Sequence, residues 1–340
     1  MFSEIISIGD ELLIGQVINS NASWIAQQMN SIGISVSRIN VVADNHDEII
    51  SALSESSNRV KIVIITGGLG PTKDDITKPT ICEYFNSKLV FNEDAYQDIV
   101  SLFSIRSSKV TEINKNQAML PDNCIALPNK EGTARGMWFE KNGVIYVFMP
   151  GVPFEMKTMV SQTILPELIK KFTLPAIVHK TVLTQGIGES YLSEIIASWE
   201  NELPSHIKLA YLPSPGIVRL RLTAKGEDKN ILQKEVDLLV KKLEQIIPQY
   251  IYGMDEELLE SIIGKLLREK KQTIATAESC TGGYIAHLIT SIPGSSDYFT
   301  GSIVSYDNRI KIDELGVDRS SIEKHGAVSK EIVTQMAENI

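Results

Sequence analysis

Apolar and polar positions along the first part of the chain alternate in the way that a parallel sheet with crossover helices requires. Short β-rich runs are separated by segments in which apolar residues recur at helical spacing, as at Ala22, Ile25 and Met29. The expected strands are residues 4–8, 34–42, 61–66 and 142–148, and the expected helices are residues 21–29, 47–56, 78–85 and 154–171. Together they predict a first domain, residues 1–172, with an open and mostly parallel α/β sheet.

The pattern changes after residue 172 and predicts two further units. Residues 173–254 follow the order strand, helix, strand, strand, helix, strand, which indicates a small α+β domain. Its expected strands are residues 178–185, 207–212, 217–224 and 250–252, and its expected helices are residues 189–199 and 229–247. In residues 255–340 we expect strands at 273–276 and 299–306 and helices at 256–270, 284–292 and 330–339. This third unit is short for an independent α/β core, so we interpret it as an incomplete domain.

Composition and charge restrict the class of protein. The chain has 340 residues, 43% hydrophobic and 22% charged, as is typical of soluble globular proteins. Its formal net charge of -9 disfavours a large nucleic-acid interface, yet it allows a small phosphorylated ligand held by backbone N–H groups and a metal ion. Cys82, Cys124 and Cys280 are far apart, as in proteins of a reducing cytosol. Because we find neither a secretory signal nor an apolar run of the ~20 residues that span a bilayer, we expect a cytoplasmic protein.

The most informative motif is the glycine-rich loop TGGLGPTKDD at residues 66–75, which lies between an expected buried strand and a helix. Open α/β sheets bind ligands at such positions. The loop residues expected to contact a phosphate through their backbone are Gly67, Gly68, Gly70 and Thr72. Asp74 and Asp75 offer the hard oxygen ligands that suit Mg²⁺. The alternative is a Gly-Pro turn in which Asp75 only caps the next helix.

Other loops of the first domain end at the same edge of the expected sheet. Asp10 and Glu11 follow the first strand, and Asn21 and Asp44 lie at comparable element ends. Two further loops, NKEGTARG and PGVP, offer as ligand contacts Gly132, Thr133, Gly151 and Glu155. Each loop alone is more often a turn or a helix cap. Together they would enclose an elongated ligand such as a dinucleotide.

The third unit contains a candidate nucleophile. Ser279 in AESCTGG follows an expected strand and precedes a helix, so its hydroxyl would face helix-terminal N–H groups that suit an oxyanion. A serine nucleophile needs a base, and Tyr306 and Lys311 are the nearest candidates along the chain. Cys280 is a rival nucleophile that His325 would have to activate. The structural alternative for Ser279 is a helix cap.

Seven motifs in order make the chain resemble the competence/damage-inducible CinA family: GDELLIG, TGGLGPTKDD, GTARG, PGVPFEM, GIGES, AESCTGG and HGAVS. The resemblance covers essentially the whole chain. It implies a molybdopterin-binding-like first domain with metal-dependent ADP-ribose pyrophosphatase activity, a KH-like second domain and a nicotinamide-nucleotide amidase third domain. It also implies a homodimer that acts in pyridine-nucleotide recycling.

The resemblance also implies roles for particular residues. It assigns the diphosphate and the metal to Gly67, Gly68, Gly70, Asp74 and Asp75, and the lining of the same pocket to Asp10, Glu11 and Asn21. In the third domain it assigns the nucleophile to Ser279, the base to Lys311 and the third catalytic member to Tyr306. The implied cofactor is Mg²⁺ or a similar divalent ion, and a monovalent cation is a further candidate.

Two departures from the family pattern stand out. Arg135 replaces the proline expected in GTAPG, which would either add a phosphate contact or alter the loop. The amidase domain of the family is expected to continue beyond residue 340, so the third unit corresponds to part of that domain.

Three functions follow as hypotheses. The leading one is hydrolysis of ADP-ribose to AMP and ribose 5-phosphate by the first domain. The second is deamidation of nicotinamide mononucleotide at Ser279, and the third is a non-catalytic protein that binds molybdopterin or a competence partner. A small nucleotide is therefore the expected ligand. A membrane partner is not expected, and nucleic acid is disfavoured because the second domain has neither a clear GXXG loop nor an evident basic face.

Overall fold

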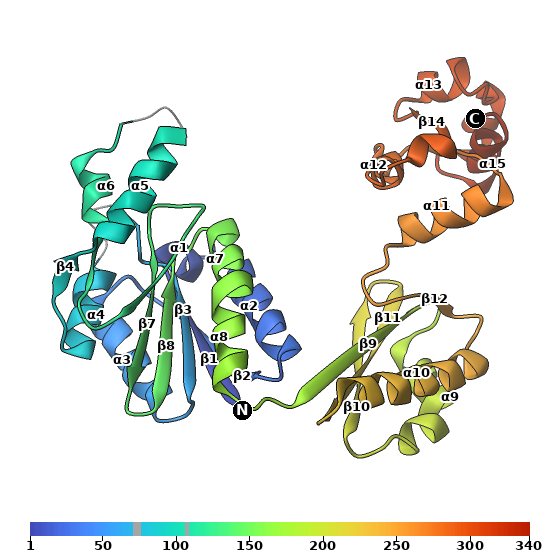
Figure 1. The fold of residues 1–340 in the computed structure, drawn as a ribbon. Coiled ribbons are helices and arrows are strands. Elements are labelled where there is room, and N and C mark those ends of the chain that lie inside the picture. Colours follow the sequence, from blue (N-terminus) through green and yellow to red (C-terminus); the bar gives the residue numbers. More distant parts are fainter. Residues whose placement is uncertain (71–75, 106–108) are drawn as a thin grey trace. The chain divides into compact units, whose positions relative to one another are not determined.

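The computed structural model describes residues 1–70, 76–105 and 109–340. These residues form two compact units, one mainly of Met1–Val178 and the other mainly of His179–Thr223 and Glu235–Ile340. Figure 1 shows the ribbon of both units. The predicted domain boundaries at residues 172 and 254 stay predictions.

The first unit is built on a six-stranded sheet in the order β2-β1-β3-β8-β7-β6. Its strands are β1 (Phe2–Ile8), β2 (Ser35–Val42), β3 (Ile62–Thr66), β6 (Ile125–Leu127), β7 (Gly136–Lys141) and β8 (Val144–Met149). The pairs β1–β2, β1–β3 and β3–β8 are parallel, whereas β7–β8 and β6–β7 are antiparallel. The expected open, mostly parallel α/β sheet is thus confirmed, with an antiparallel edge that the sequence pattern did not predict.

The strand predicted at residues 142–148 begins two residues too early. Asn142 and Gly143 have φ values of 53° and 76° and form the turn between β7 and β8. Positive φ at both residues of a two-residue loop is what an Asn-Gly hairpin turn requires. This dipeptide is the signal from which the antiparallel edge of the sheet could have been predicted.

Helices cover both faces of this sheet (Figure 1). On one face lie α2 (Ser20–Ser31), α7 (Pro153–Met159) and α8 (Leu165–Lys171), and on the other lie α3 (His46–Ser57), α4 (Thr77–Phe85) and α5 (Glu93–Ile105). Alternate residues of β3 point to the two faces, with Ile62 and Ile64 in one apolar cluster and Val63 and Ile65 in the other. A strand buried on both faces gives the continuous apolar run seen in the sequence.

The helix predicted at residues 154–171 is interrupted. A π-helical turn, Val160–Ile164, separates α7 from α8, and Pro166 stands in the first turn of α8. Proline lacks an N–H group and its ring displaces the carbonyl one turn earlier, so the regular hydrogen-bond ladder is locally widened. Besides β6 and β7, the elements that the sequence did not predict in this unit are α5 and also α1 (Asp10–Leu13), β4 (Leu89–Phe91), α6 (Glu112–Asn116) and β5 (Met119–Pro121).

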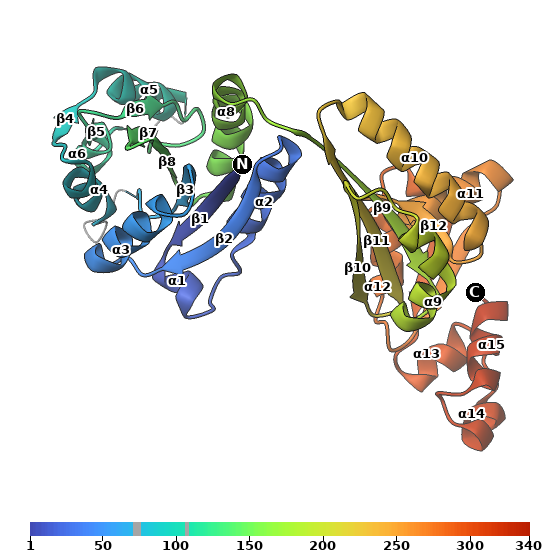
Figure 2. The ribbon, with the colours of Figure 1, turned by 90° about the horizontal axis from the view of Figure 1, so that it is seen from below.

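The second unit contains a four-stranded sheet in the order β10-β11-β9-β12. Its strands are β9 (Ala176–Gln185), β10 (Ile207–Ser214), β11 (Ile217–Gly226) and β12 (Ile251–Met254). Helices α9 (Glu189–Asn201) and α10 (Lys229–Ile246) lie against this sheet (Figure 2). The indole N–H of Trp199 donates to the Leu239 carbonyl at 3.2 Å and joins the two helices. The predicted β-α-β-β-α-β order is observed.

The last part of the second unit has two parallel strands, β13 (Ile274–Glu278) and β14 (Phe299–Val304). The helices around them are α11 (Leu259–Lys270), α12 (Tyr284–Thr290), α13 (Asn308–Asp313), α14 (Arg319–His325) and α15 (Lys330–Glu338). A small apolar cluster holds α15 in place through Ile332 and Met336. Throughout the part of the chain that the structure describes, no helix is both long and apolar enough to cross a membrane.

One buried ion pair fixes β1 of the first unit to the end of α3. The Glu4 side chain, 1% exposed, accepts hydrogen bonds from Arg59 Nε at 2.7 Å and Nη2 at 2.8 Å, and from the Ser56 hydroxyl at 2.7 Å. Burial alone would raise the pKa of Glu4, but the Arg59 and Ser56 hydrogen bonds and the Arg59 charge lower it below its ordinary value. The ionised Glu4 carboxylate therefore stabilises the folded state fully at pH values above its pKa in the unfolded chain. This contribution is lost as the pH falls through the lower pKa that Glu4 has in the folded state.

We predict that Glu4→Gln lowers the free energy of unfolding at pH 7 by about 3 kcal/mol, because it leaves Arg59 without its buried partner. Urea unfolding of the full chain measures this. The matched control is Glu55→Gln, since Glu55 also contacts Arg59 at 3.3 Å but is 62% exposed, and it should cost at most about 0.5 kcal/mol. The Glu4→Gln effect should shrink on acidification, and a pH-independent effect would contradict the assignment.

Candidate functional site

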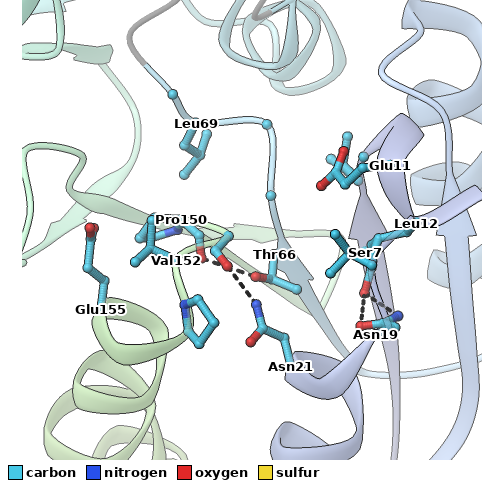
Figure 3. Close-up of a pocket in the computed structure, with 18 of the residues that line it drawn as sticks. Ser7, Glu11, Leu12, Asn19, Asn21, Thr66, Leu69, Pro150, Val152 and Glu155 are labelled. Carbon is cyan, nitrogen blue, oxygen red and sulfur yellow. Dashed lines mark hydrogen bonds between the residues drawn. The ribbon is translucent and has the colours of Figure 1, made fainter. Parts of the chain in front are cut away.

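A cavity of about 500 Å³ opens in the first unit beside the carboxyl ends of β1, β3 and β8 (Figure 3). Parallel strands end at the same edge of a sheet, so the loops that follow them meet there. Ser7 and Ile8 of β1 and Thr66 of β3 line the cavity, and Pro150 follows β8. The cavity is therefore formed where the sequence placed a ligand site.

Most of the site residues predicted in the first domain line this cavity. They are Glu11, Asn21, Gly67, Gly68, Gly70, Thr133, Gly151 and Glu155. Asp10 and Gly132 do not line it, but each contacts a residue that does. Thr72, Asp74 and Asp75 lie outside the described residues.

Glycines bring the three strand ends together. A Cβ atom added to Gly67, whose φ is +104°, would lie 2.0 Å from the Ile8 carbonyl oxygen, and one added to Gly68 would lie 2.2 Å from the Thr77 hydroxyl. One added to Gly151 would lie 3.4 Å from Gly67 Cα. Only glycine fits the first of these positions, since its neighbour is backbone that cannot move aside.

Part of the glycine loop offers unpaired backbone donors. Gly67 N–H donates to the Met149 carbonyl at 3.1 Å. The N–H groups of Gly68, Leu69 and Gly70 donate to no acceptor within the described residues. Successive free N–H groups in a glycine turn form a concave site for an anion.

Acidic side chains gather at one end of the cavity. Asp44 N–H donates to Asp10 Oδ1 at 3.3 Å, and the Thr77 hydroxyl donates to Asp44 Oδ1 at 3.3 Å. Burial raises the pKa of Asp44, and the negative charges of Asp10 and Glu11 add to this effect. In residues 1–70, 76–105 and 109–340, no group of three or more His, Cys, Asp or Glu is arranged to hold a metal ion.

Glu155 forms the opposite end of the cavity (Figure 3). The buried Asn129 amide donates from Nδ2 to Glu155 Oε2 at 2.7 Å and to the Ala134 carbonyl at 2.9 Å. Its Oδ1 accepts the N–H groups of Glu131 and Gly132, both at 3.1 Å. Asn129 thus holds the loop that carries Thr133. The sequence analysis did not single it out, although asparagine before a Gly-containing turn is a known signal.

Arg135 does not reach the cavity. Its guanidinium donates to Asp98 Oδ2 of α5, with Nε at 2.9 Å and Nη2 at 2.6 Å. The expectation of an added phosphate contact is therefore not met by this side chain, because the ion pair with Asp98 occupies it.

Asn21 crosses between two loops of the cavity. Its Nδ2 donates to the Gly151 carbonyl at 2.7 Å, which ties the start of α2 to the loop after β8. Its Oδ1 is buried and has no hydrogen-bond partner among the described residues. Asn19, two residues earlier, caps α2, and its Nδ2 also donates to the Ser7 hydroxyl oxygen at 3.0 Å.

The second unit brings Ser279 and Lys311 together. Lys311 is 2% exposed, and its Nζ donates to Ser279 Oγ at 3.2 Å, to the Tyr306 carbonyl at 3.3 Å and to the Ser305 carbonyl. The side chain of Tyr306 is 76% exposed, so its carbonyl rather than its phenol faces the lysine. Cys280 is exposed and forms no hydrogen bond to His325 within the described residues.

Glu278 is a residue of this second site that the sequence analysis missed. It is 2% exposed and accepts the N–H groups of Gly283, Ile285 and Ala286 at 3.1, 3.1 and 2.8 Å. Burial alone would raise the pKa of Glu278, but these N–H groups and the Thr281 hydroxyl lower it. The helix-terminal N–H groups expected to face Ser279 therefore point to Glu278 instead.

Comparison with known proteins covers the whole chain. Residues 4–170 match the family model of the probable molybdopterin binding domain. Residues 179–253 match that of the damage-inducible protein CinA KH domain, and residues 256–340 match that of the CinA C-terminal domain.

Relatives that match over the full length of the chain agree with these matches. A CinA-like protein of Flavobacterium psychrophilum is 50% identical over 342 residues, which cover 100% of this chain and 82% of the relative. A CinA-like protein of Cytophaga hutchinsonii is 48% identical over 340 residues, with 100% and 81% covered. The crystal structure of the protein CinA with unknown function from Thermoplasma acidophilum is 30% identical, with a TM-score of 0.45, and covers 48% of this chain and 96% of that chain. The chain therefore belongs to the CinA family.

Proposed function

We propose that the first unit hydrolyses ADP-ribose to AMP and ribose 5-phosphate with the help of a divalent cation. The observation that carries this proposal is the cavity of about 500 Å³ beside the glycine loop, with free N–H groups in its middle and carboxylates at two ends. Its volume is in the range of pockets for ligands of this size. A diphosphate flanked by two sugars would place its negative charge on these N–H groups.

The chain's own residues would bind and orient the ligand. The N–H groups of Gly68, Leu69 and Gly70 would donate to diphosphate oxygens, because they have no acceptor within the described residues. Attack of a water oxygen on phosphorus would break the bridging P–O bond and give the two monophosphate products. No carboxylate needs to touch the diphosphate in this arrangement.

The negative charge at the acidic end of the cavity would attract a divalent cation. Asp10, Glu11 and Asp44 crowd negative charge there, and no lysine or arginine lines the cavity within the described residues. We propose that Asp74 and Asp75, which lie outside the described residues, hold Mg²⁺ or a similar ion. Such an ion supplies neutralisation of the diphosphate charge and a water of lowered pKa.

Replacing both Asp74 and Asp75 by alanine should lower AMP formation from ADP-ribose by more than about 100-fold, since the cation would lose its ligands. The release of AMP by the purified chain in Mg²⁺ measures this. Asp47→Ala is the matched control, because Asp47 is 95% exposed and does not line the cavity. Unchanged turnover in the double variant would remove these residues from the mechanism.

A second candidate function, amidohydrolysis in the second unit, is favoured by the contact between Lys311 and Ser279. Ser279 Oγ would attack the carboxamide carbon of nicotinamide mononucleotide with Lys311 as the base, and ammonia would leave. Hydrolysis of the resulting ester would release nicotinate mononucleotide. Both activities would serve pyridine-nucleotide recycling. A homodimer and a cytoplasmic location stay predictions.

Ser279→Ala should abolish ammonia release from nicotinamide mononucleotide, whereas Cys280→Ala should leave it within about twofold of the wild type. A coupled assay for ammonia on the full chain distinguishes the two nucleophiles. Equal activity of wild type and Ser279→Ala would exclude the serine, and loss of activity only in Cys280→Ala would favour the cysteine.

A further inference from the structure

The Glu155 carboxylate is held in one position by two features of the neighbouring loop. Asn129 donates to its Oε2 at 2.7 Å. A Cβ atom at Gly132 would lie 2.0 Å from the same oxygen and 2.5 Å from Oε1, so the carboxylate rests directly on the glycine backbone. Asn129 also fixes that backbone, because its Oδ1 accepts the N–H of Gly132 at 3.1 Å. The loop and the carboxylate therefore form one preorganised unit.

Among residues 1–70, 76–105 and 109–340, Glu155 has no cationic partner. No lysine, arginine or histidine in the described part of the chain forms an ion pair with it, and Asn129 is its one hydrogen-bond donor there. The carboxylate lines the cavity with its remaining acceptor capacity unused. A charged carboxylate can accept about four hydrogen bonds, so it is suited to bind donor groups of a ligand.

The position of Glu155 decides which part of a ligand it would meet. Figure 3 shows Glu155 and Glu11 on opposite sides of the cavity, with Thr66 and Leu69 between them. A phosphate would be repelled by either carboxylate and attracted by the N–H groups of the glycine loop. The groups that reach Glu155 are therefore those that flank a central anionic group.

We propose that Glu155 determines specificity by accepting hydrogen bonds from the hydroxyl groups of one of the two sugars that flank the diphosphate. Carboxylates recognise ribose hydroxyls in this way in dinucleotide-binding folds. Asn129 is a positioning residue in this scheme, since it acts on the ligand only through Glu155. The inference rests on the proposed function in one respect, namely that the ligand is a diphosphate between two sugars.

The test is a comparison of binding affinities. Isothermal titration calorimetry in EDTA, and again in Ca²⁺, is used to compare ADP-ribose with two analogues, each lacking the 2-hydroxyl of one ribose. The wild type should bind one analogue about 10- to 100-fold more weakly than ADP-ribose, because a hydrogen bond to a charged group is lost. Glu155→Gln should bind ADP-ribose more weakly by a similar factor. Glu155→Gln should bind that analogue and ADP-ribose with equal affinity. The ratio of its affinities for ADP-ribose and the other analogue should stay as in the wild type.

Two further variants make the result specific. Asn129→Asp keeps the acceptor for Gly132 N–H but removes the donor to Glu155. It should therefore reduce the affinity ratio between ADP-ribose and the analogue that Glu155 distinguishes, and leave the ratio for the other analogue unchanged. Glu167→Gln, whose carboxylate pairs with Lys170 on α8 and does not line the cavity, should behave as wild type. Circular dichroism shows whether each variant is folded.

The outcomes separate the inference from the proposed function. Suppose that the wild type binds ADP-ribose and that Glu155→Gln shows the same affinity ratios as the wild type for both analogues. The role proposed for Glu155 is then wrong, and the proposed function is unaffected. If the wild type binds ADP-ribose under neither condition, the proposed function is wrong and the inference fails with it.

Discussion

The site in the first unit depends on one steric constraint, the absence of side chains where three strand ends meet. Gly67 packs on the Ile8 carbonyl after β1, and Gly151 packs on Gly67 after β8. Because these neighbours are backbone atoms, no change of rotamer could make room for a Cβ atom at Gly67. The same positive φ angles, 104° at Gly67 and 67° at Gly68, form the turn in which the N–H groups of the next residues have no acceptor within the described residues. Close approach of the strands and exposure of donors are thus two effects of one local geometry.

The distribution of charge around this geometry limits the ligand. Glu11 and Glu155 occupy opposite ends of the cavity, and between them lie the glycine-loop N–H groups that have no acceptor in the part of the chain that the structure describes. A ligand with its phosphate at one end, such as a mononucleotide or a pterin phosphate, would place that phosphate against a carboxylate. A ligand with a central diphosphate would place its charge on the donors and the hydroxyl groups of one sugar beside Glu155. This argument favours a ligand with a central diphosphate over one with a terminal phosphate.

The sequence predicted those features that depend on local patterns. Buried parallel strands such as β3 appear as apolar runs, and amphipathic helices such as α2 appear as periodic ones, so the sheet and the glycine loop could be placed. The contact of Asn129 with Glu155 joins residues 26 positions apart, and no local pattern encodes it. The pairing of Arg135 with Asp98 is equally non-local, and for that reason the sequence left open whether Arg135 adds a phosphate contact or alters the loop. The π-helical turn before Pro166 depends on how a continuous helix accommodates a proline against the core, which the apolar spacing does not show.

The second site follows a different principle, since a buried carboxylate rather than a set of glycine contacts fixes its turn. Glu278 accepts three N–H groups at the start of α12 and thereby withdraws them from any ligand at Ser279. Gly282 N–H donates to the Ser279 carbonyl at 3.0 Å and is also occupied. Within the described residues, the N–H groups of Cys280 and Thr281 donate to no backbone carbonyl. An oxyanion formed on attack by Ser279 would therefore have to be stabilised by the turn that carries the serine and not by the helix that follows it.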